Sequence, residues 1–175
     1  MDVWDIICQA ISIIAVIVGF ISFQMKTDKQ VLTLQTLVSI LFTAHYLMLG
    51  ATDAAILNAV GIIRNFVYHN KDKKFYSPKI FPALFAIIMV FLGFLSWINW
   101  SSILVITGLA INTVFLSCKN PQNLRKSILV SSPMVLVYNI INLSIGGMIY
   151  ESVVIVSSIV GIIRYADKKN NFKKF

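Results

Sequence analysis

Polar side chains inside long apolar runs are the residues of this chain that could do chemistry. Two of them, Asn58 and Ser158, stand at equivalent positions before two copies of the pentapeptide Val-Gly-Ile-Ile-Arg, at 60–64 and 160–164. A polar group within an apolar segment is costly and usually faces a bundle interior or a cavity. Such groups offer hydrogen bonds to a neutral polar solute. The candidates are Asn58, Ser158, Ser157, His45, Tyr138, Asn112, Asn139 and Asn142, and the first six are predicted to contact substrate.

A structural interpretation of the same residues stays open. Asparagine and serine also join membrane helices through hydrogen bonds and close packing. A lone histidine such as His45 can take part in proton coupling, because its ordinary pKa is near neutral. A lone histidine near a helix end is more often a hydrogen-bonded structural residue.

The repeated pentapeptide adds two arginines and two glycines to the candidates. Arg64 and Arg164 lie about one helical turn inside the predicted cytoplasmic boundary, which favours contact with lipid phosphates. A gating role on that side is the alternative. We expect Gly61 and Gly161 to permit close helix packing, and Pro133 to kink its helix, with a hinge as one consequence.

Enzymatic and metal chemistry find no support in the sequence. There is no G-x-S-x-G, H-E-x-x-H, phosphate-binding or dinucleotide-binding motif. The histidines, His45 and His69, fall on opposite sides of the predicted membrane, and so do the cysteines, Cys8 and Cys118. We therefore expect no catalytic residue, metal, cofactor or disulfide. The net charge of +8 is accompanied by no nucleic-acid-binding motif, so nucleic acid is not an expected partner.

The elements that must position these residues are apolar helices. The chain is 58% hydrophobic and only 13% charged, whereas soluble domains carry about 25% charged residues. Period-two alternation is absent, which argues against a membrane β-barrel. We predict an all-α polytopic membrane protein with seven transmembrane helices, at about 6–25, 31–50, 54–68, 80–98, 102–117, 124–145 and 148–165.

Charge placement predicts the orientation of these helices. With seven spans, all 15 Lys and Arg residues fall on or next to one side, and Asp2, Asp5, Asp53 and Glu151 fall on the other. Basic residues mark the cytoplasmic side. The N-terminus is therefore expected outside and the C-terminus in the cytoplasm.

The pentapeptide repeat predicts how the helices are grouped. Under this topology helices one to three and five to seven start outside and end inside, so two parallel units need a return helix between them. We expect a first three-helix unit at 1–74, a linker helix at 75–99, and a second three-helix unit with a basic cytoplasmic tail at 100–175.

Several short signatures resemble those of the YgjV-type family of bacterial inner-membrane proteins. They are Gln24, Gln35, the stretch from His45 to Gly50, Ile56-Leu57-Asn58-Ala59, and Ser144-Ile145-Gly146-Gly147 followed by Ile162-Ile163-Arg164. This resemblance implies a multi-pass protein of the bacterial inner, or cytoplasmic, membrane.

The three-plus-one-plus-three plan is more distantly similar to the SWEET sugar transporters and the wider PQ-loop group. Those proteins bind sugar through an asparagine on the last helix of each unit, and they need no cofactor. Asn58 fits that pattern, whereas Ser158 departs from it. The Pro121-Gln122 pair lies in a predicted loop and not within a helix.

Two functions are consistent with these observations. The first is a facilitative transporter of a small polar solute, sugar-like or another metabolite, that rocks its two units about a midplane site. The second is a non-transporting membrane protein with a structural, assembly or lipid-interacting role, acting through its basic cytoplasmic face. Membrane lipids are expected partners in both.

Overall fold

The computed structural model is all-α in the residues that it describes, which are 3–23, 25, 27–70, 80–116 and 121–172. Seven helices occupy these ranges, and no strand is found in them. The order is α1 (Val3–Phe23), α2 (Asp28–Met48), α3 (Thr52–His69), α4 (Phe81–Leu95), α5 (Ser102–Leu116), α6 (Pro121–Ile141) and α7 (Ile145–Phe172). The all-α prediction and the seven helical segments are confirmed.

Local signals explain where several helices begin and end. Thr27 caps α2 by accepting a hydrogen bond from the N–H of Gln30. The turn between α2 and α3 contains Gly50 at φ +74°, a left-handed conformation that glycine adopts without strain. Pro82 lies in the first turn of α4, where its missing N–H costs little.

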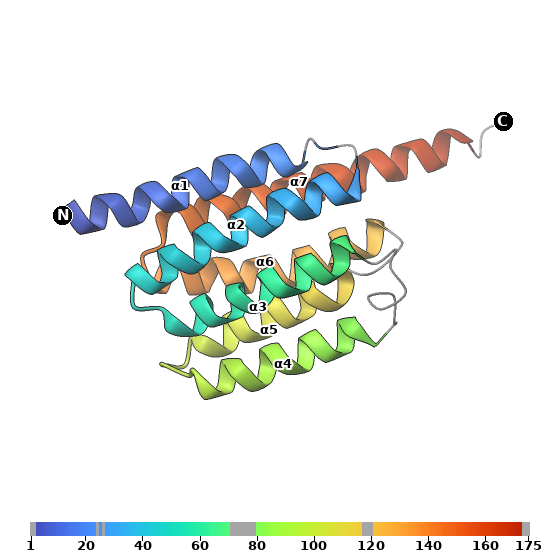
Figure 1. Cartoon of the computed structure of the whole chain (residues 1–175). Helices are drawn as coiled ribbons and strands as arrows, with labels where there is room; N and C mark the ends of the chain where they lie inside the picture. Colours follow the sequence, from blue (N-terminus) through green and yellow to red (C-terminus); the bar gives the residue numbers. More distant parts are fainter. Residues whose placement is uncertain (1–2, 24, 26, 71–79, 117–120, 173–175) are drawn as a thin grey trace.

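Successive helices run in opposite directions within one bundle (Figure 1). The start of α1 and the end of α7 therefore lie at opposite ends of the bundle, and α7 extends beyond the other helices (Figure 1). The short turns after α2, α4 and α6 lie at the end where α1 begins.

The helix contacts have a repeating pattern. Helix α2 packs between α1 and α3, and α6 packs between α5 and α7. The two sets of three meet where α3 packs on α5 and where α1 packs on α7. These contacts close into a ring of six helices, and exchanging the first three helices for the last three leaves the pattern unchanged. Helix α4 packs outside the ring against α3 and α5.

Glycines allow the close contact between α1 and α7. A Cβ atom added at Gly19 would overlap the ring of Tyr150, and one added at Gly146 would overlap Ser12. One glycine from each helix thus faces a side chain of the other. Small residues have this role at many membrane helix interfaces, where backbones must approach closely.

The outer surface of the bundle is apolar. Ile17, Ile87 and Val156 leave 55%, 66% and 59% of their surface exposed, and many other large aliphatic and aromatic side chains are exposed as well. By length and composition, three helical segments could cross a membrane: Val3–Ser22, Lys29–Met48 and Ile145–Ile163. Shorter apolar helices occupy Phe81–Leu95 and Ser102–Leu116. An exposed apolar surface of this extent indicates contact with lipid rather than water.

Candidate functional site

Polar side chains join the first three helices to the last three through the interior of the ring. We call them the inter-unit polar network, and their hydrogen bonds run between α2 and α6, α3 and α6, α3 and α5, and α2 and α7. The network lies inside a bundle whose exterior is apolar. Its main members are His45, Tyr46, Asp53, Arg64, Asn65, Thr113, Ser132, Tyr138, Asn139, Ser144, Tyr150 and Glu151.

His45 closes the network at the end where α1 begins. Its Nδ1 lies 2.9 Å from the carbonyl oxygen of Cys8, and its Nε2 lies 2.8 Å from Oγ of Ser144. Because a carbonyl oxygen only accepts, Nδ1 carries the proton and Nε2 accepts from the Ser144 hydroxyl. His45 has no exposed surface. Both ring nitrogens are used within the protein, so this histidine ties α1 and α2 to the α6–α7 turn.

Two tyrosine hydrogen bonds follow next to this end of the bundle. The Tyr138 hydroxyl donates to Oδ1 of Asp53, which also accepts the backbone N–H of Ala54 at 2.8 Å. The Tyr46 hydroxyl donates to Oδ1 of Asn139 at 2.6 Å. Asp53 lies in the first turn of α3, where the helix dipole favours a carboxylate. These two bonds connect α3 and α2 to α6.

A carboxyl group from α7 lies further into the bundle. Glu151 is hydrogen-bonded to Ser132 of α6, and burial removes much of its contact with water. The side chain is nevertheless only half-buried. Beside it, the Tyr150 hydroxyl donates to Oε1 of Gln35 at 3.3 Å.

Arg64 places a guanidinium inside the bundle between α3 and α5. Its Nη1 donates to Oγ1 of Thr113 at 2.7 Å, and Nε and Nη2 donate to Oδ1 of Asn65 at 3.2 and 2.9 Å. Only 8% of its surface is exposed. In the described part of the chain it forms no ion pair with a carboxylate. The side chain of Arg64 turns inward to hydrogen-bond acceptors on α3 and α5, and its predicted contact with lipid phosphates stays a prediction.

Three buried polar atoms among the described residues have no hydrogen-bond partner. They are Nδ2 of Asn65, Oγ of Ser131 and Nδ2 of Asn139. Each of these residues is at most 1% exposed. An unmet buried donor or acceptor costs about 1–3 kcal/mol. Buried polar groups in native proteins normally have a hydrogen-bond partner, so these three atoms are candidates for contact with a bound polar molecule.

The sequence-predicted substrate residues fall into different environments. His45 and Tyr138 belong to the inter-unit polar network. Asn58 is half-buried, and its amide donates to the Ala54 carbonyl of its own helix at 3.0 Å. Ser158 is buried. Asn112 is half-buried and Ser157 is exposed, so Ser157 does not line the interior.

The two glycines of the repeated pentapeptide have different surroundings. A Cβ atom at Gly61 would lie 3.6 Å from Oγ of Ser39 and 3.7 Å from Nη2 of Arg64, which are ordinary contacts. At Gly161 it would overlap the side chain of Arg125, which donates to the Gly161 carbonyl at 3.2 Å. Gly161 thus makes room for an arginine and not for a helix backbone.

The remaining predicted residues are only partly described. The side chain of Arg164 lies outside the described part of the structure, as does Cys118. Pro133 lies inside α6, and its role as a kink or hinge stays a prediction. Cys8 is buried and free. No group of three or more His, Cys, Asp and Glu residues in the described ranges could hold a metal ion.

Sequence reasoning missed Asn65, Ser131, Ser132 and the inward roles of Arg64 and Glu151. A usable signal was present for the two charges. Arg64 lies within the predicted run 54–68 and Glu151 within 148–165. Charges inside a span face the bundle interior. Charge placement instead uses both residues to assign the two sides of the membrane.

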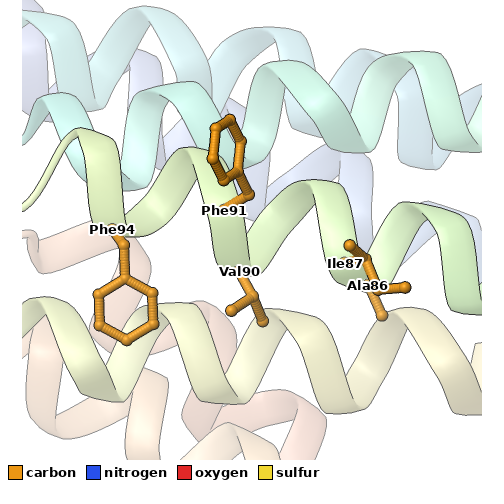
Figure 2. Close-up of a pocket in the computed structure, with 5 residues that line it drawn as sticks. All are labelled: Ala86, Ile87, Val90, Phe91 and Phe94. Carbon is orange, nitrogen blue, oxygen red and sulfur yellow. The ribbon is translucent and has the colours of Figure 1, made fainter.

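An apolar groove lies along α4. It has a volume of about 430 Å³ and is lined by Ala86, Ile87, Val90, Phe91 and Phe94 (Figure 2). These side chains project from one helix and offer no hydrogen-bonding group. A polar solute has nothing to bind there, so this groove is not the polar site.

Comparisons with known proteins give one match. A family model described as "Bacterial inner membrane protein", Imp-YgjV, matches residues 6–169. No curated protein and no solved structure gives a significant match to the chain.

The bond between Tyr138 and Asp53 provides a stability test of the network. Tyr138→Phe removes a donor from a buried carboxyl group, so we expect a loss of about 1–3 kcal/mol in the free energy of unfolding. Denaturant unfolding in detergent would measure it. Ser152→Ala, which removes an exposed hydroxyl bonded to its own helix, is the control and should change stability by less than about 0.5 kcal/mol. Equal stabilities of the two variants would show that the Tyr138 bond contributes nothing.

Proposed function

Because this chain belongs to the Imp-YgjV family of bacterial inner membrane proteins, we propose that it carries a small polar solute across that membrane. The observation that carries this proposal is the set of unpartnered polar atoms in the interior, Asn65 Nδ2, Ser131 Oγ and Asn139 Nδ2. They lie in a bundle whose exterior is apolar. A bundle that only had to be stable would gain by replacing them with apolar groups.

The proposed transporter consists of two parallel three-helix units and a linker helix. The units span 1–74 and 100–175, and 75–99 contains the linker. The repeating contacts support this grouping, since α3 packs on α5 as α7 packs on α1 while α4 stays outside the ring. Repeat-built transporters bind substrate near the midplane between their repeats and work by rocking one repeat against the other. Here the interface between the units is the inter-unit polar network.

The proposed solute contacts differ from those predicted first. His45 and Tyr138 form hydrogen bonds with other protein groups. We therefore propose that they hold the two units together. Asn65, Ser131 and Asn139 have free hydrogen-bonding atoms and take the role of solute contacts. The repeat-related pair Asn58 and Ser158, near the middle of α3 and α7, stays a proposal for further solute contacts. So does a gating role for Arg164.

We also propose seven membrane spans with the N-terminus outside and the C-terminus in the cytoplasm. The alternating helix directions place the start of α1 and the end of α7 at opposite ends of the bundle. Among the described side chains, Lys29, Arg64, Arg125 and Lys126 lie on or next to the end at which α7 finishes, and basic residues mark the cytoplasmic side.

A non-transporting role in assembly or lipid interaction is the second candidate. The observation that favours it is the apolar groove on α4, which could hold an acyl chain or an apolar helix. This role explains the exterior of α4 but leaves the unpartnered interior atoms without a purpose.

The orientation has a direct test. Phosphatase and fluorescent-protein reporters fused after Phe175 distinguish the two sides, because the phosphatase is active only outside the cytoplasm. We expect fluorescence without phosphatase activity at this end. A phosphatase fused before α1 by means of an exported leader should be active. Phosphatase activity at the C-terminal fusion would contradict an odd number of spans with this orientation.

The transport proposal can be tested by counterflow in proteoliposomes of the full chain, with labelled glucose, glycerol, alanine and succinate. We expect saturable flux of at least one of them. Ser131→Ala should weaken its apparent affinity by roughly two- to tenfold, because one net hydrogen bond contributes about 0.5–1.5 kcal/mol.

The same variant should keep its thermal stability, since the lost hydroxyl has no partner in the described structure. Ser152→Ala is the matched control on the exposed surface and should leave flux unchanged. Absence of flux for every solute would count against transport and favour the assembly or lipid role.

A further inference from the structure

We infer that the bound molecule carries an oxyanion, a carboxylate or a phosphate, that pairs with Arg64. This inference rests on the proposed function, which supplies the bound solute. It adds the chemical class of solute that the same interior site would select. A phosphate could also come from a lipid headgroup, and the experiment below separates the two sources.

The first argument is the unpaired charge of Arg64. An arginine side chain stays protonated in proteins, and this one is 92% buried, as 8% of its surface is exposed. Its three hydrogen bonds go to neutral oxygens of Asn65 and Thr113. A buried charge without a counter-charge is strongly unfavourable, and buried charges are normally paired. No carboxylate of the described chain provides that counter-charge.

The second argument is the number of free donors on the guanidinium. An arginine has five N–H groups. Three of them are used, one each on Nε, Nη1 and Nη2, which leaves one N–H on Nη1 and one on Nη2. One N–H group on each terminal nitrogen can donate to the two oxygens of a carboxylate or phosphate, which forms a bidentate pair.

A further donor lies beside the guanidinium. The Oδ1 atom of Asn65 accepts from Arg64, while its Nδ2 has no partner and its side chain has no exposed surface. Asn65 therefore holds the guanidinium with one end and offers a donor with the other. All the free atoms here are donors, and an oxyanion is an acceptor.

Gly61 lies beside this arginine and carries no side chain. The place where a Cβ atom would stand lies 3.7 Å from Nη2 of Arg64 and 3.6 Å from Oγ of Ser39. Any larger side chain at this position would project between the guanidinium and α2. The hydroxyl of Ser39 would be a neighbouring donor for the same ligand.

Ligand-dependent thermal stabilisation of the purified full chain in detergent tests the inference. The probes are succinate and glycerol 3-phosphate as anions, and glucose and glycerol as neutral solutes. We expect a saturable rise in melting temperature with at least one anion and none with the neutral solutes. Arg64→Lys should need at least tenfold more anion, because a lysine cannot bind in bidentate fashion. Arg64→Met should lose the response.

Lys126→Met is the control for a general charge effect, because Lys126 is an exposed base on α6. It should respond to the anions as the unaltered chain does. Proteoliposomes of phosphatidylcholine, with and without phosphatidylglycerol, provide the arm for a lipid source. Stabilisation that requires phosphatidylglycerol and Arg64 identifies the oxyanion as a headgroup.

Asn65→Asp keeps the test decisive if Arg64 variants fail to fold. It places a carboxylate on the atom that already accepts two hydrogen bonds from Arg64. We expect a higher melting temperature without ligand and no further rise with either anion. An unchanged anion response in Asn65→Asp would overturn the inference.

The outcomes separate this inference from the transport proposal. Flux of neutral solutes that Arg64→Met leaves intact would overturn the oxyanion inference and keep transport. Anion or headgroup stabilisation that depends on Arg64, without flux of any solute, would keep the inference and count against transport. No Arg64-dependent response to either anion or to phosphatidylglycerol would overturn the inference whatever the flux.

Discussion

Hydrogen bonds between the first three helices and the last three are the interactions on which this bundle depends. Its exterior is apolar, and in an apolar solvent helices gain little from burying apolar side chains against one another. Packing of small residues and polar contacts must hold the helices together instead. Both are present, as Gly146 lies against Ser12 in the α1–α7 contact and Tyr138 reaches across to Asp53.

The inter-unit polar network combines partnered and unpartnered groups, and the unpartnered amides of Asn139 and Asn65 lie near one end and farther in, respectively. At the end where α1 begins, both nitrogens of His45 have partners, and Asp53 accepts from Tyr138 and Ala54. Toward the other end, Arg64 has no carboxylate partner among the described residues and Asn65 keeps an unpartnered amide.

The sequence predicted the helices better than it predicted their ends. The run at 80–98 contains α4 (Phe81–Leu95), because an uninterrupted apolar stretch of that length has few alternatives. The run at 124–145 was placed too late, since α6 starts at Pro121 and ends at Ile141. Proline is well suited to a first helical turn, and hydropathy alone does not separate the turn at 142–144 from a helix. Helix α7 continues to Phe172, because polar residues stop a membrane span without stopping a helix.

The candidate site was harder to predict, because the direction of a side chain depends on how its helix is rotated. Asn58 and Arg64 share α3, yet the asparagine bonds its own backbone and the arginine reaches α5. The repeated pentapeptide likewise places Gly61 beside Ser39 and Arg64 at ordinary contact distances, whereas a Cβ atom at Gly161 would overlap Arg125. Identical residues in the two copies thus have different neighbours, because the neighbours depend on how the whole bundle packs.

The central claim is that this protein turns polar side chains toward its interior and apolar side chains toward lipid. Cysteine accessibility in native membranes tests it most directly, with Cys8 and Cys118 replaced by alanine. Ser132 is 5% exposed and bonded to Glu151, whereas Val130, two residues away on α6, is 57% exposed. We predict that a charged, water-soluble thiol reagent modifies Ser132→Cys and leaves Val130→Cys unmodified, because lipid shields the latter. Modification of Val130→Cys but not of Ser132→Cys would contradict the account.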